Sequence, residues 1–128
     1  MSEILAKVRG EIPFPEAGEG VIIRFTNNDI VELQTLLGDD IIQNAAIRAA
    51  NFDIRFIAEC AKRGVIKKGM VVPQKDYDHV PLEDLGAKIV DGLWVAAFGR
   101  TYEDQIRWAT IERARRDADE SPPESPAT

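Results

Sequence analysis

The alternation of apolar and polar residues predicts two strands in the first part of the chain. Residues 4–12 alternate between aliphatic and charged side chains, and residues 21–26 place aliphatic and aromatic side chains on one face. A period of two is typical of a strand with one buried face. Residues 13–20, between them, contain two prolines and two glycines, which break regular structure. We therefore expect an antiparallel hairpin.

The pattern then changes to the spacing of helices with one apolar face. Apolar residues recur every three or four positions over residues 28–37, after the capping side chains of Asn27–Asp29 and before Gly38, placed for a left-handed C-terminal cap. Similar spacing predicts four further helices, over residues 41–50, 53–64, 81–98 and 101–116. The first of these four presents small residues and can approach its neighbours closely.

Several single residues are expected to mark helix ends or close contacts. Asp53 is placed to cap its helix, and Gly64 and Gly99 to end theirs. Residues 81–98 place apolar side chains along two lines of the helix surface, which predicts a helix in the centre of the fold. Its interior glycines, Gly86 and Gly92, each cost about 1 kcal/mol relative to alanine, so we expect another backbone to pack closely there.

These elements predict an α+β fold in one domain, residues 1–116. A lone hairpin is marginal in water, so the N-terminal antiparallel β-hairpin must pack on the four to five helices. Residues 65–80 show no sustained period and are expected to form a long connector. Residues 117–128 hold four acids, no base, and several prolines and serines, a composition typical of a disordered tail.

Charge and composition exclude several classes of partner. The net charge is −6, and four of the acids belong to the tail, so the domain is nearly neutral. We expect no nucleic-acid partner, because phosphate binding needs a positive surface. No run approaches the roughly 20 apolar residues of a membrane helix, and no secretion signal is recognised. One cysteine, Cys60, favours a reducing cytoplasm.

Residues suited to catalysis are few. His79 lies beside Asp76 and Asp78, but no further ligand or nucleophile stands at a useful spacing, which favours a surface loop. Cys60 lies on an apolar helix face, which favours a core position. Asp39-Asp40 fits the charged start of a helix. We predict no catalytic, cofactor-binding or metal-binding residue, and no cofactor. A small enzyme using His79 is the remaining alternative.

Two groups of basic residues are interpreted as solvated helix ends, with docking to an acidic partner as the alternative. The first group is Lys62, Arg63, Lys67 and Lys68, and the second is Arg113, Arg115 and Arg116.

Large apolar residues gather on the last two predicted helices. Most are expected to be core residues, but aromatic residues left exposed on helices are common anchors of protein interfaces. The candidates for partner binding are Trp94, Phe98, Tyr102, Trp108 and Ile111. A small protein with amphipathic helices and no catalytic equipment is interpreted as a binding protein and not an enzyme.

A strand pair precedes Ile30–Gly38, and the phrases Leu36–Asp40, Phe56–Gly64 and Leu85–Leu93 follow along the chain. This order, over about residues 5–106, resembles the tail assembly chaperones of tailed phages and gene transfer agents. The phrases are patterns of apolar residues and glycines, and the loops at 13–20 and 65–80 depart from the compact form of the group.

The resemblance implies a chaperone in the cytoplasm of a bacterial host that binds the tape measure protein during tail assembly. The tail tube protein is a second candidate partner, and homo-oligomerisation stays open. The alternative is a structural tail or head–tail connector component that remains in the particle.

Overall fold

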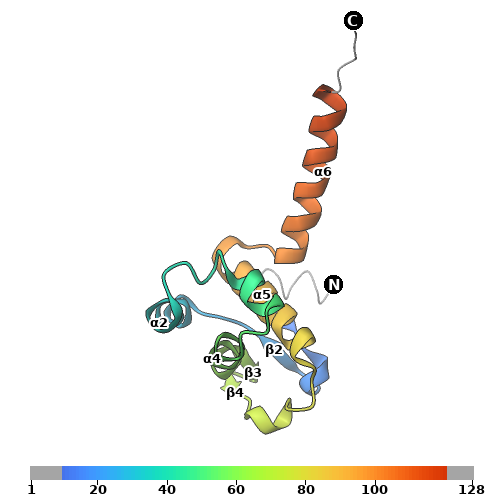
Figure 1. Ribbon diagram of the computed structural model, residues 1–128. Coiled ribbons are helices and arrows are strands. Elements are labelled where there is room, and N and C mark those ends of the chain that lie inside the picture. The colour runs from blue at the N-terminus through green and yellow to red at the C-terminus, as the bar shows by residue number, and fades with distance from the viewer. Residues whose placement is uncertain (1–9, 121–128) are drawn as a thin grey trace, which may run out of the picture.

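The computed structural model describes residues 10–120 and confirms the α+β fold. The strands are β1 (Ile12–Pro13), β2 (Val21–Ile23), β3 (Val65–Lys67) and β4 (Met70–Val71). The helices are α2 (Asn27–Leu37), α3 (Ala45–Ala50), α4 (Ile54–Gly64), α5 (Leu82–Phe98) and α6 (Tyr102–Glu120), with short 3-10 helices at Pro15–Ala17 and Gln74–Asp76. Figure 1 shows the sheet and the helices α2, α4 and α5 in one body, from which α6 projects.

The four strands form one antiparallel sheet in the order β1-β2-β3-β4. The prediction of a long connector over residues 65–80 is therefore wrong, because its first part is the hairpin of β3 and β4. Both residues of the turn, Lys68 (φ 52°) and Gly69 (φ 79°), have the positive φ angles that tight hairpins require. The two strands are too short to show a period of two in the sequence.

The predicted first strand, residues 4–12, is only partly represented. Within the described residues β1 contains Ile12 and Pro13, so it extends one residue into the segment that was expected to be a turn. Residues 4–9 of that prediction lie outside the described residues.

The start of α2 lies one residue earlier than predicted. Thr26 is the N-cap: its side chain accepts a hydrogen bond from the backbone N–H of Asp29 (3.1 Å), and the Asp29 carboxylate accepts one from the Thr26 N–H (2.9 Å). This reciprocal pair is a capping box. At the other end Gly38 was predicted to be a left-handed cap. Its φ is positive (120°), but its ψ of 150° lies outside the left-handed helical region.

The helix predicted over residues 41–50 is shorter. Residues 39–44 form turns, and α3 begins at Ala45. Asp39-Asp40 therefore does not begin a helix, and the Asp40 carboxylate instead accepts a hydrogen bond from the Asn44 side chain (2.7 Å). The Asp53 cap is confirmed, because its carboxylate accepts from the Phe56 N–H (3.1 Å).

The ring of Phe25, just after β2, lies between two glycines on different helices. A Cβ atom at Gly64 of α4 would lie 2.5 Å from Phe25 Cζ, and one at Gly92 of α5 would lie 2.7 Å from Ile23 Cγ2 and 3.1 Å from Phe25 Cε2. Helix α4 ends at Gly64, as predicted, but Gly64 is its last helical residue and not a left-handed cap, and it makes room for this ring. The close contact expected at Gly92 is confirmed, although side chains make it in place of a backbone.

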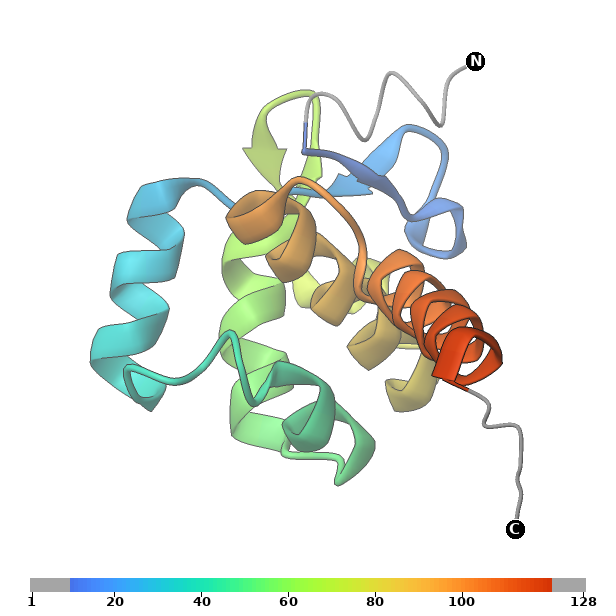
Figure 2. The same cartoon turned by 90° about the horizontal axis from the view of Figure 1, so that it is seen from above.

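Helix α6 leaves the body after a sharp corner. Gly99 ends α5 in the predicted left-handed conformation, and the Thr101 side chain accepts a hydrogen bond from the Asp104 N–H (3.0 Å). Figures 1 and 2 show α6 directed away from the sheet and the other helices. The helix continues to Glu120, so the predicted tail does not begin at residue 117. Residues 121–128 lie outside the described part of the chain.

The contacts of the two glycines of α5 lead to a prediction about stability. Gly92→Ala should lower the free energy of unfolding by about 2 kcal/mol, because overpacking outweighs the helix propensity gained by alanine. Gly86→Ala is the matched control: its Cβ would lie 3.3 Å from Ala49 Cβ, a tight but less severe contact. Urea unfolding of both variants measures the difference. A Gly92→Ala protein as stable as the Gly86→Ala protein would contradict the contact.

Candidate functional site

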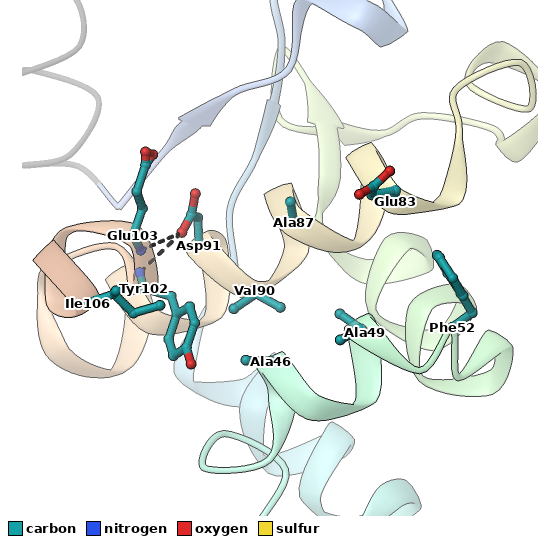
Figure 3. A pocket seen from close by; sticks show the side chains of 11 residues that line it. Ala46, Ala49, Phe52, Glu83, Ala87, Val90, Asp91, Tyr102, Glu103 and Ile106 are labelled. Carbon is teal, nitrogen blue, oxygen red and sulfur yellow. Dashed lines mark hydrogen bonds between the residues drawn. The ribbon is translucent and has the colours of Figure 1, made fainter.

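A groove of about 520 Å³ lies between α3, α5 and the first turns of α6 (Figure 3). Ala46 and Ala49 of α3 face Ala87 and Val90 of α5 across it. Helix α3 can lie close to α5 because Gly86 has no side chain: a Cβ atom there would lie 3.3 Å from Ala49 Cβ. The facing sides of α3 and α5 are apolar here, and the space between them can take the side chains of a partner.

Aromatic and branched side chains mark the two ends of this groove (Figure 3). Phe52 lies at one end, while Tyr102 and Ile106 lie at the other. Phe52 is half exposed and has a φ of 55°, a left-handed conformation that is uncommon for a residue other than glycine. The turn that holds it is fixed by backbone hydrogen bonds from Phe52 N–H to Ala49 and from Asp53 N–H to Arg48.

The charges at the groove are all negative. Glu83, Asp91 and Glu103 are among the residues that line it, and within residues 10–120 no basic residue does. Asp91 also holds the corner together: one carboxylate oxygen accepts hydrogen bonds from the backbone N–H groups of Tyr102 (3.1 Å) and Glu103 (3.3 Å). Burial raises the pKa of this carboxyl above its ordinary value, although the two N–H groups act in the opposite direction.

The five residues predicted to bind a partner fall into two groups. Trp94, Phe98 and Tyr102 form an aromatic cluster, with ring centroids 4.6 Å apart for Trp94 and Phe98 and 5.2 Å apart for Trp94 and Tyr102. The Trp94 Nε1–H is buried and has no hydrogen-bond partner in the described part of the chain. Among the five candidates, only Tyr102 lines the groove.

Trp108 and Ile111 lie apart from this cluster, on α6. Their side chains are 59% and 51% exposed. At 100° per residue they lie on the face of α6 opposite to Tyr102 and Ile106. The groove residues Phe52, Ala87 and Ile106 were not predicted as site residues, and the run of small residues in α3 was the only feature of the sequence that pointed to the groove.

The residues weighed for catalysis do not lie together in a site. His79 is exposed in a turn, as predicted, and its Nε2 lies 3.0 Å from the Glu16 carbonyl oxygen. Cys60 is fully buried in the core, as predicted, and burial raises the pKa of its thiol. Asp76 and Asp78 are exposed. Residues 10–120 contain no cluster of three or more acidic, histidine or cysteine side chains arranged to hold a metal ion.

One basic group differs from the prediction of solvated helix ends. Arg63 lies at the end of α4 and forms ion pairs with Glu59 on its own helix (2.9 Å) and with Glu32 on α2 (3.0 Å). Its hydrogen bond lowers the pKa of Glu59. Lys67 and Lys68 lie at the hairpin turn of β3 and β4, not at a helix end. Arg63 therefore connects α4 to α2.

No protein-family model, curated protein or solved structure matches the chain. Among the described residues, no helix has the length and apolar character needed to cross a membrane.

The double hydrogen bond of Asp91 predicts a difference between two substitutions. Asp91→Ala leaves two N–H groups of α6 without their acceptor and should lower the free energy of unfolding by about 1 kcal/mol. Asp91→Asn keeps an acceptor oxygen and removes a charge that burial disfavours, so its stability should stay close to that of the wild type. Urea unfolding followed by circular dichroism compares them. Equal stability of the two variants would show that the hydrogen bonds do not hold the corner.

Proposed function

We propose that this protein is a tail assembly chaperone of a phage-like particle, which binds helical segments of the tape measure protein in the groove between α3, α5 and α6. The proposal is supported by the resemblance in the order of strands, helices and glycine-ended phrases, and by the apolar character of the groove. It places the protein in the cytoplasm of a bacterial host, acting by binding and not by catalysis.

The single observation that carries the proposal is the row of alanines that forms the groove. An amphipathic helix binds a groove through residues at every third or fourth position. Small residues such as Ala49 and Ala87 let those side chains enter, and the half-exposed Phe52 ring at one end and the partly buried Tyr102 ring at the other provide apolar contact area. A tape measure protein with long apolar helical faces would be kept soluble by such coverage.

The test is co-expression with the tape measure protein encoded nearby in the same genome. The wild-type protein should co-purify with it and increase its soluble fraction. Ala87→Arg places a long charged side chain in the groove and should reduce the co-purified amount about tenfold or more. Ala87 is exposed on α5, so the substitution does not disturb the core.

The matched control is Val31→Arg, which introduces the same side chain at an exposed position of α2 away from the groove. It should co-purify like the wild type. Failure of the wild type to bind or solubilise the tape measure protein would overturn the proposal. Detection of the chain in purified particles by mass spectrometry would also contradict it, because a chaperone leaves before the particle is complete.

A further inference from the structure

Most of α6 extends beyond the groove to which its first turns belong. The groove involves α6 only through Tyr102, Glu103 and Ile106. Residues 107–120 continue the helix for about 21 Å at 1.5 Å per residue. Figure 1 shows this part of α6 leaving the body, with α5 the element against which its base lies.

The extended part of α6 presents an apolar face to solvent. Trp108 and Ile111 are three residues apart, and Arg115 follows four residues later, so the three side chains lie along one face of the helix. Both apolar side chains are more than half exposed. Tryptophan and arginine are the residue types most enriched at the energetic centres of protein interfaces.

The charges of this helix segment complement those of the groove. Residues 107–116 contain four arginines and one carboxylate, Glu112. Among the described residues, the groove is lined by Glu83, Asp91 and Glu103 and by no basic residue, and Glu103 already pairs with Arg107 of its own helix (3.7 Å). An α6 segment seated in the groove would therefore bring arginines to acidic side chains, while Trp108 and Ile111 would meet the alanines.

We propose that the α6 face formed by Trp108, Ile111 and Arg115 in one copy of the chain occupies the α3–α5 groove of a second copy. The segment cannot reach its own groove, because α6 is one continuous helix whose first turns form a wall of that groove. The contact joins two different surfaces, so each copy offers one groove and one helix. Two copies can each place α6 in the groove of the other and form a closed pair. Alternatively, each copy can bind the next one head to tail in a longer assembly.

This inference goes beyond the proposed function and does not require it. The α6 face of a second copy covers the groove when no tape measure protein is bound there. Since the second copy and the tape measure helix occupy the same groove, self-association and client binding exclude each other at each groove.

Light scattering after size exclusion, over a wide range of protein concentration, tests the self-association. The wild-type mass should rise above the 14.2 kDa of one chain as the concentration increases. Trp108→Ala/Ile111→Ala and Ala87→Arg should each weaken association about tenfold or more and remain monomeric at concentrations where the wild type associates. The control Val31→Ala/Leu36→Ala removes exposed apolar residues of α2 and should associate like the wild type.

Mixing the two defective variants tests the pairing of surfaces. The Trp108→Ala/Ile111→Ala protein keeps an intact groove, and the Ala87→Arg protein keeps an intact helix face, so the mixture should form a one-to-one pair although each alone is monomeric. Circular dichroism confirms that both variants are folded. A wild type that is monomeric at every concentration would overturn the proposal. So would a mixture that stays monomeric, or an Ala87→Arg protein that associates like the wild type.

Discussion

The fold depends on the space that two glycines leave for one aromatic ring. Phe25 follows β2 and lies against both α4 and α5, which approach it closely because neither Gly64 nor Gly92 has a side chain. This contact places the sheet against two helices at once. The central position of α5 follows from it, and α5 in turn carries the alanine and valine of the groove and the carboxylate that caps α6. The contact at Phe25 therefore helps to fix the position of α5, which forms one side of the candidate groove.

Much of the fold could be predicted from local patterns, and the failures have identifiable physical causes. The helices were found because their apolar spacing is sustained, and Asp53 and Gly99 have the expected capping roles. The hairpin of β3 and β4 was missed because its strands are too short to show a period of two and because its turn places a lysine, Lys68, at a positive φ angle. Gly64 was correctly placed at the end of α4, but its contact with the Phe25 ring was not predicted, because a glycine that ends a helix and one that admits a ring look alike in sequence.

The candidate site was less predictable than the fold, since it depends on distances between elements. The large apolar residues on the last two helices were predicted as a single group of partner-binding candidates, but the corner at Gly99 and Thr101 divides them between a packed cluster and an extended helix. The groove consists largely of alanines on α3 and α5, which are ordinary helix residues until the two helices are placed side by side. Only the structure reveals that they leave a hollow between them.

The reactivity of the single, buried cysteine depends on local opening of the fold around α4. Cys60 has no exposed surface and faces the core from α4, the helix that Phe25 and Arg63 attach to the rest of the body. A thiol reagent reaches this sulfur only when α4 separates from its neighbours. The rate at which the reagent modifies Cys60 therefore measures how often α4 separates from its neighbours, and no introduced cysteine is needed.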